Sequence, residues 1–174
     1  MKARLGKVNR MTHQNHFDLL SSGKKQWEKW RRESLDVEAL EPDLHGADLH
    51  DVDLQGIDLR EADLSEANLQ GADLRDADLS DADLRNANLK GANLSNANLL
   101  RARFNWADMR ATSLCSANLK ETDLSHADLS GANLDGAILS RTKFDGTNFS
   151  GVSFRGVDLN KADLRRSVHA EISG

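Results

Sequence analysis

The residues of this 174-residue chain that could carry out chemistry are one cysteine, six histidines and 28 carboxylates. Cys115 has no histidine marked out as its base, and the carboxylates recur at a fixed spacing instead of forming a distinctive pair. No histidine has cysteine or acidic partners at the spacing of a metal site, and neither G-x-G-x-x-G nor a P-loop occurs. We therefore expect no enzyme, no bound metal and no cofactor.

Charge is distributed unevenly along the chain, although the net charge is only −5. Residues 43–83 hold 13 acidic and 2 basic side chains, a net charge of −11, whereas residues 1–42 carry +3 and residues 84–166 carry +4. An acidic segment of this kind repels nucleic acid and attracts a basic partner. We therefore expect an unidentified protein partner and no direct binding of nucleic acid.

The composition argues against a membrane protein and against a disulfide-stabilised one. No window approaches 18 apolar residues, and the basic stretch of residues 1–10 is not followed by the apolar segment of a secretory signal. A lone cysteine cannot form an internal disulfide and fits a reducing compartment. We expect a cytoplasmic protein that does not interact with membranes.

A period of five residues governs the chain from Leu44 to Leu164. The 25 positions of this series hold 20 Leu, 4 Phe and Met109, and a small or β-branched residue, most often Ala, stands two positions before each. Five residues advance an α-helix by about 500°, so the leucines would drift around it, and in a flat strand they would alternate between faces. Only a chain that turns a corner every five residues keeps the series inside, which predicts a solenoid around a narrow apolar axis.

The repeated units ADLSE, ANLQG, ADLRD and ANLKG resemble the pentapeptide repeat family, whose pattern is approximately A-(D/N)-L-x-x. The resemblance covers residues 43 to about 166 and implies an all-β solenoid, a right-handed quadrilateral β-helix with four units per coil. About six coils at ~4.8 Å each would form a rod roughly 29 Å long. The resemblance also implies a non-catalytic scaffold or protein-interaction module, as most members of the family are.

Four apolar residues before the repeats share one side of a helix by their spacing, which predicts a helix over about residues 16–33. They are Phe17, Leu20, Trp27 and Trp30. We expect this helix to cap the apolar end of the first coil, because solenoids need such covers. The alternative is a helix that binds a partner or a membrane surface.

The chain is thus expected to consist of an N-terminal segment (1–42), a repeat domain (43–166) and a C-terminal tail (167–174). The tail is a thin cover for an open strand edge, which invites pairing with another chain. We expect a monomer or a dimer that associates through the C-terminal end.

If four units form a coil, residues twenty apart are neighbours in adjacent coils, and columns of outward side chains can be assigned from the sequence. Arg101 then lies above Asp81, and Arg103 above Asp83, so these arginines interrupt acidic columns. Exposed pairs of opposite charge contribute about 0.2–1 kcal/mol each. The candidate acidic face consists of Asp43, Glu61, Asp63, Glu66, Asp81 and Asp83.

Three outward residues in the middle of the chain form a candidate partner contact: Leu100, Trp106 and Arg110. Tryptophan and arginine are frequent anchors of protein interfaces. The alternative is that Trp106 lies flat on its column neighbours, Asn86 and His126, and has no partner.

The resemblance also leaves a second function open, a DNA-mimicking regulator of a DNA-binding protein such as gyrase. Some pentapeptide repeat proteins present gyrase with a rod of the width and charge of duplex DNA. The acidic residues 43–83 favour this alternative. The basic residues 84–166, the uninterrupted repeats and the lack of a C-terminal dimerisation helix argue against it.

Overall fold

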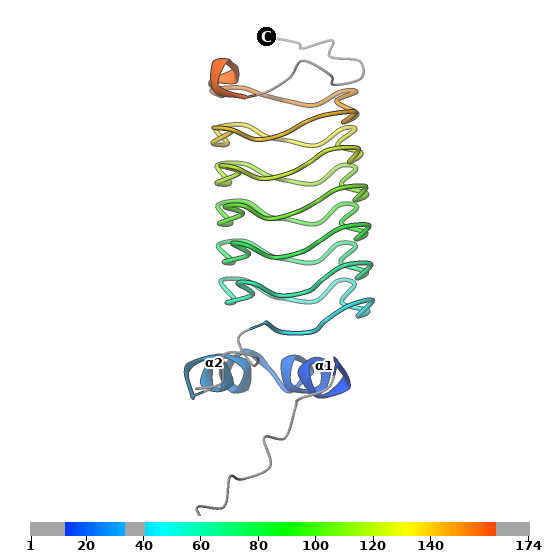
Figure 1. Cartoon of the computed structure of the whole chain (residues 1–174), viewed down its shortest axis with the longest axis vertical. Coiled ribbons are helices and arrows are strands. Elements are labelled where there is room, and N and C mark those ends of the chain that lie inside the picture. The colour runs from blue at the N-terminus through cyan, green and yellow to red at the C-terminus, as the bar shows by residue number, and fades with distance from the viewer. Residues whose placement is uncertain (1–12, 34–40, 163–174) are drawn as a thin grey trace, which may run out of the picture.

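The computed structural model describes residues 13–33 and 41–162, which form a stack of coils with two short helices at its N-terminal end (Figure 1). Helix α1 spans His13–Ser21 and helix α2 spans Lys24–Glu33. The 3-10 turn η2 (Leu159–Lys161) lies at the C-terminal end of the stack. Within these two described stretches, no helix has both the length and the apolar character needed to cross a bilayer.

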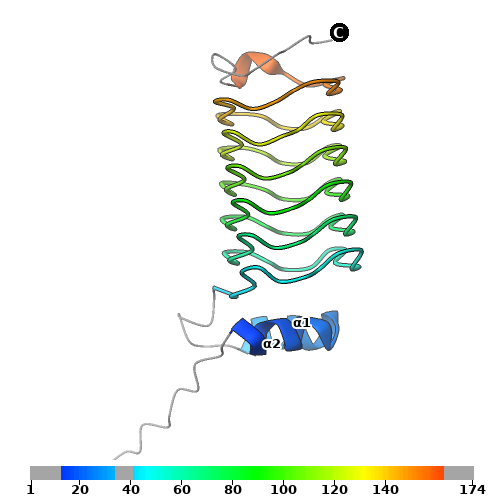
Figure 2. The same ribbon diagram turned by 90° about the vertical axis from the view of Figure 1, so that its right-hand side faces the viewer.

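Each coil contains twenty residues and has four faces. Parallel β-bridges join residues twenty apart in four separate series, and the first bridges are Asp43↔Asp63, Asp48↔Asn68, Asp53↔Asp73 and Asp58↔Asp78. Each bridge involves a single residue on each side, so the described coils contain bridges but no extended strands. The predicted solenoid with four units per coil is confirmed, and Figure 2 shows the coils stacked in parallel.

We name the faces by their bridged residues and number the coils from 1 (residues 41–60) to 6 (residues 141–160). Face 1 carries Asp43, Asp63, Asp83, Arg103, Asp123 and Lys143. Face 2 carries Asp48, Asn68, Asn88, Asp108, Asp128 and Asn148. Face 3 carries Asp53, Asp73, Asn93, Ser113, Asn133 and Ser153. Face 4 carries Asp58, Asp78, Asn98, Asn118 and Ile138.

The axis of the stack is filled by the predicted series, because every fifth residue from Leu44 to Phe154 is buried. A second inward column, mostly alanine, contains four buried threonines: Thr112, Thr122, Thr142 and Thr147. Each threonine hydroxyl donates to the backbone carbonyl 23 residues earlier in the chain, at 2.7–3.0 Å. The apolar axis therefore accepts these hydroxyls without leaving them unsatisfied.

The corners explain why Asp or Asn precedes the inward leucine. At the first corner, the Ala47 N–H donates to the Leu44 carbonyl at 3.0 Å, and Gly46 between them has φ +62. At most corners an outward Asp or Asn side chain accepts the backbone N–H two residues later, as Asp63 does from Ser65 at 2.9 Å and Asn88 does from Lys90 at 3.2 Å. Asp and Asn are suited to this bond, which prepares the chain to turn.

The two ends differ from the predicted pattern. The helix expected over residues 16–33 is interrupted at Gly23 (φ +112), which separates α1 from α2. Leu159, expected at an inward position of the repeat, lies in η2 and is only partly buried. Leu164 and the tail lie outside the described residues.

Helices α1 and α2 lie across the open end of coil 1 (Figure 2). Trp27 is completely buried there, and its Nε1 donates to the Asp58 carbonyl at 2.7 Å. From α1, the His16 Nδ1 accepts the Asp43 backbone N–H at 3.2 Å. The apolar side of the helix pair thus continues the axis of the solenoid.

Candidate interaction surface

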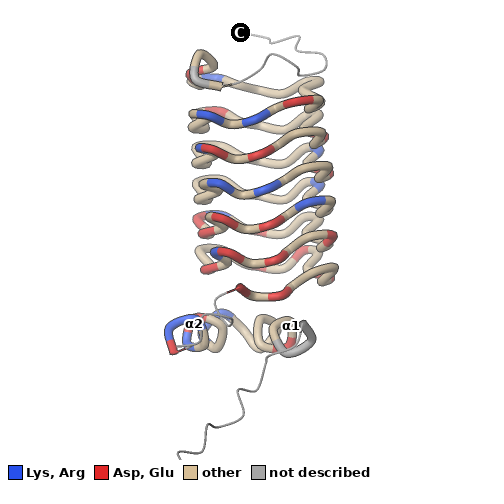
Figure 3. The backbone as a smooth tube through the Cα atoms, viewed as in Figure 1, with Lys and Arg blue, Asp and Glu red and all other residues tan. Residues whose placement is uncertain are grey.

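All six residues of the candidate acidic face lie on or beside face 1. Asp43, Asp63 and Asp83 are bridged members of that face. Glu61 and Asp81 occupy the corner that precedes it, and Glu66 occupies the corner that follows it, each with a positive φ. Figure 3 shows the acidic residues as red bands on the lower coils.

Above these coils, the charges on face 1 alternate in sign and form ion pairs between adjacent coils. Arg101 binds both carboxylate oxygens of Asp81 at 2.7 and 2.6 Å, and Arg103 approaches Asp83 to 3.4 Å. Two coils higher, cations again pair with the carboxylates one coil below, in the pairs Arg141–Glu121 (3.4 Å) and Lys143–Asp123 (3.6 Å). The carboxylates of coils 3 and 5 on this face are therefore neutralised from above.

Asp83 shows the electrostatic consequence of this pairing. Burial raises the pKa of a carboxyl group, but hydrogen bonds from Arg85 and the charge of Arg103 outweigh it, so the pKa of Asp83 is lowered. Arg85 binds Asp83 at 2.6 Å from within the same coil. This carboxylate is ionised and already has two cationic partners.

The carboxylates of coil 2 that lie on or beside face 1 differ from Asp83 in this respect. Within the described residues, neither Glu61 nor Asp63 has a lysine or arginine nitrogen within 4.0 Å. The only ion pair of Glu66 in the same part of the chain is with the His45 Nε2 at 4.0 Å. Among the described residues of coil 2, Glu61 and Asp63 are thus carboxylates on or beside face 1 that no lysine or arginine binds directly.

Trp106 occupies the corner between faces 1 and 2, in the column that also contains Glu66, Asn86, His126 and Gly146. Its side chain is 63% exposed, and its φ of +64 is unusual for a bulky residue. The indole stacks on the imidazole of His126, with ring centroids 4.1 Å apart and an angle of 12°. The imidazole in turn lies beneath Gly146 of the next coil, where a Cβ would come within 2.5 Å of its Nδ1.

The other two residues of the predicted contact lie at different corners. Leu100 is half-buried in the turn that precedes face 1, whereas Arg110 follows face 2. The Arg110 guanidinium binds both carboxylate oxygens of Asp108 at 2.8 and 2.5 Å. The three residues therefore do not form one continuous patch, because the twenty-residue coil turns a corner between each of them. Leu100 and Trp106 flank face 1, and Arg110 does not.

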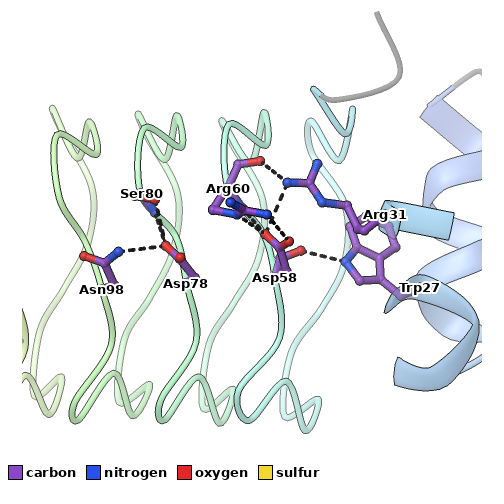
Figure 4. A network of polar contacts seen from close by, with 7 residues as sticks. All are labelled: Trp27, Arg31, Asp58, Arg60, Asp78, Ser80 and Asn98. Atoms are coloured by element: carbon purple, nitrogen blue, oxygen red, sulfur yellow. Dashed lines mark hydrogen bonds and ion pairs between the residues drawn. The ribbon is translucent and has the colours of Figure 1, made fainter. Parts of the chain in front are cut away.

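A second cluster of charges connects α2 to face 4 (Figure 4). Arg31 donates to a carboxylate oxygen of Asp58 at 3.2 Å and to the carbonyl of Arg60 at 3.1 Å. Burial would raise the pKa of Asp58, but hydrogen bonds from Arg60 and Arg31 outweigh it and lower the pKa to about 2. Farther along face 4, Asp78 accepts from Asn98 at 3.0 Å. This cluster connects α2 to coil 1 and links adjacent coils along face 4.

The described residues hold no group of three or more His, Cys, Asp or Glu side chains that could bind a metal ion. Cys115 is half-buried and accepts a weak hydrogen bond from the Ser113 hydroxyl at 3.6 Å. Face 1 is a charged surface with an exposed aromatic ring at its edge. His126 was identified in the sequence only as a neighbour of Trp106, and the twenty-residue spacing was the signal that could have paired their rings.

Comparison with known proteins gives one family. The family model described as pentapeptide repeats matches the chain in eight copies, over residues 43–81, 77–114, 102–141 and 139–168. No curated protein matches the chain in sequence.

The chain is also similar to several solved structures. One is HetL, a pentapeptide repeat protein involved in heterocyst differentiation regulation in the cyanobacterium Nostoc sp. strain PCC 7120 (24% identity, 75% of this chain, 86% of HetL, TM-score 0.49). Another is a pentapeptide repeat protein from the thylakoid lumen of Arabidopsis thaliana (27% identity, 71% and 68% coverage, TM-score 0.40). A third is QnrB1, a plasmid-mediated fluoroquinolone resistance protein (19% identity, 72% and 83% coverage, TM-score 0.26).

Proposed function

Since the chain belongs to the pentapeptide repeat family, we propose that it is a non-catalytic scaffold that binds a protein partner through face 1. The observation that carries this proposal is the exposed Trp106 at the edge of that face. A tryptophan at positive φ costs on the order of 1–2 kcal/mol of backbone strain. The turn does not require a tryptophan at this position, because glycine occupies the same column at Gly46 and Gly146. The indole is therefore explained by contact with a partner and not by the conformation of the turn.

Face 2 supports this proposal by contrast, because several of its outward side chains bind one another. On face 2, the Asn88 amide donates to Asn68 at 3.0 Å, and Asn68 donates to Asp48 at 2.9 Å. Side chains that bind one another in this way leave few groups for a partner. Face 1 instead combines charge with an exposed aromatic ring, the two properties that favour recognition of another protein.

The proposal has four further parts, which concern the N-terminal helices, the handedness of the coil, the location of the protein and its oligomeric state. We propose that α1 and α2 cap coil 1, as the burial of Trp27 and Leu20 supports. We further propose a right-handed coil, a cytoplasmic protein, and a monomer or a dimer that associates through the C-terminal end.

Duplex mimicry is the second candidate, favoured by the acidic lower coils of face 1. A mimic needs a continuous negative surface, and the cations at Arg101, Arg103, Arg141 and Lys143 interrupt it. We expect no inhibition of gyrase supercoiling and no relief of quinolone inhibition at micromolar protein. Activity in either assay that is lost when Asp63, Asp83 and Glu66 are neutralised would establish mimicry instead.

The test of the scaffold is affinity capture from the source organism with two matched variants. Trp106→Gly removes the ring from the edge of face 1, and Asn96→Gly changes the same turn position (φ +61) at the corner between faces 3 and 4. We expect quantitative mass spectrometry to find a protein that the Asn96→Gly variant retains and the Trp106→Gly variant loses. Equal recovery by both variants would contradict the proposal.

A further inference from the structure

We propose that the corner column of Glu66, Asn86 and Trp106 binds an extended basic polypeptide segment, with one arginine stacked on Trp106 and a second cation beside Glu66. This inference rests on the proposed function, because it names the chemistry of the partner that face 1 receives. It follows from the exposure of the Trp106 indole, the location of the exposed Glu66 carboxylate and the distance between them.

The indole of Trp106 is prepared for stacking. The His126 imidazole packs against one side of the ring at 4.1 Å and 12°, yet 63% of the residue is exposed. Gly146 leaves space for the imidazole, so the two rings are supported from the coil above. A guanidinium group is planar and stacks on aromatic faces, and tryptophan is the best of the aromatic partners for a cation.

The sign of the partner's charge follows from the carboxylates below Trp106. Asp81 and Asp83 in coil 3 are bound by Arg101, Arg103 and Arg85, so they offer little to a ligand. In coil 2, the Glu66 side chain is 63% exposed, and its ion pair with His45 spans 4.0 Å. The free negative charge thus lies two coils below the ring, and it favours a cation.

The distance between the two features fits an extended polypeptide. Glu66 and Trp106 belong to one column, and two coils at ~4.8 Å separate them by about 10 Å. An extended chain in the polyproline II conformation advances about 3.1 Å per residue with three residues per turn, so cations three residues apart lie on one side of it and reach both positions. Asn86 lies between them with an exposed amide that can bond the backbone of the bound segment. The preferred pattern is Lys/Arg-x-x-Arg.

The test is the binding of fluorescein-labelled peptides, measured by anisotropy at low and at physiological salt. The probe is a twelve-residue Gly/Ser peptide that contains Lys-Ala-Ala-Arg. One control peptide carries Glu in place of both cations, and a second carries the cations side by side. We expect the probe to bind most tightly, and salt to weaken its binding.

Protein variants assign that binding to the column. We expect Trp106→Gly to weaken binding of the probe about tenfold and Glu66→Gln to weaken it about threefold, because each removes one of two contacts. Asp76→Asn is the matched control, since Asp76 has the same turn position (φ +58) at the diagonally opposite corner. It should leave binding unchanged, and thermal melting followed by circular dichroism verifies that all three variants fold.

Several outcomes would overturn the inference: equal binding of the basic and acidic peptides, equal effects of Glu66→Gln and Asp76→Asn, or tighter binding of a single-stranded oligonucleotide. Its failure can be distinguished from failure of the proposed function. If the probe does not bind while affinity capture still depends on Trp106, the scaffold stands and the basic segment is wrong. If Trp106→Gly affects neither assay, both proposals fail.

Discussion

Faces 1 and 2 are built on the same backbone but hold their outward side chains in different ways. Face 2 forms an amide and carboxylate ladder, in which Asn148 donates to Asp128 at 3.0 Å just as Asn88 donates to Asn68. Face 1 carries fully charged side chains, and from coil 3 upward they form ion pairs between adjacent coils. Both faces have the same regular bridges, so the backbone does not dictate this difference.

The two faces differ in how much their outward side chains contribute to the stability of the fold. Ladder amides are short side chains that bond at 2.9–3.0 Å, and they reinforce each bridge locally. Exposed ion pairs between long side chains contribute only about 0–1 kcal/mol. Residue choice is therefore less constrained by stability on face 1 than on face 2, and the exposed carboxylate of Glu66 and the exposed ring of Trp106 are available for a partner.

The largest loss of stability is expected when a charged residue replaces a buried leucine of the axis. Leu84 is completely buried, so Leu84→Asp places an unpaired carboxylate in the axis at a cost of several kcal/mol. We expect no cooperative thermal transition by circular dichroism. The neighbouring outward change on face 1, Asp83→Asn, should shift stability by less than about 1 kcal/mol. A soluble Leu84→Asp protein that melts cooperatively would refute the assigned register.

The next largest loss of stability is expected at the N-terminal end of the stack, where Trp27 packs against coil 1. Trp27→Ala opens a cavity beneath coil 1 and removes the bond to the Asp58 carbonyl, which should cost about 3–5 kcal/mol. Trp30→Ala, at a half-buried position, should cost less. Denaturant unfolding measures both. Equal and small losses would show that the helices do not stabilise the coils.

An acid-dependent effect of intermediate size is expected at the α2 contact with face 4. The pKa of Asp58 is about 2, below its ordinary value of 3.8, so ionised Asp58 stabilises the folded state above pH 4. That contribution, on the order of 1–2 kcal/mol, is lost as the pH falls from about 4 to 2. The free energy of unfolding of the wild-type protein should fall over this range more steeply than that of the Asp58→Asn variant. Parallel pH profiles would contradict the assigned contact.

The smallest effects compare the two faces directly. Asn88→Ala breaks the ladder of face 2 and should cost about 1 kcal/mol. Arg101→Ala removes an exposed ion pair of face 1 and should cost less than about 0.5 kcal/mol, and less again in high salt. Urea titrations at two salt concentrations measure both values. A larger loss for Arg101→Ala would reverse the assignment of face 1 as the less constrained surface.

The sequence was sufficient to predict the core and the columns. Burial of every fifth residue follows from the spacing from Leu44 to Phe154, because only a coil that turns at each unit buries them all. The twenty-residue spacing then predicts the pairing of Arg101 with Asp81 and of Arg103 with Asp83. A repeat makes these features predictable, since each unit has the same neighbours.

Features that depend on a single residue were not predictable. Arg110 binds Asp108 in its own coil whereas Arg101 reaches the coil below, a choice between conformers of a long side chain that differ little in energy. Gly23 ends α1, although the apolar spacing continues into α2. The departure of Leu159 into η2 follows a local bond, in which the Asp158 side chain accepts from the Asn160 N–H.

The measurement that tests the central claim most directly is photo-crosslinking from one pair of matched positions in the source organism. Asn86 (φ +58) lies beside face 1 and Asn96 (φ +61) lies at the diagonally opposite corner, in the same residue of the turn. A benzoyl-phenylalanine fits either position, because Trp106 shows that the turn accepts a bulky ring. The account predicts a covalent adduct with a protein partner from position 86 and none from position 96. Adducts of equal yield from both positions, or from position 96 alone, would contradict it.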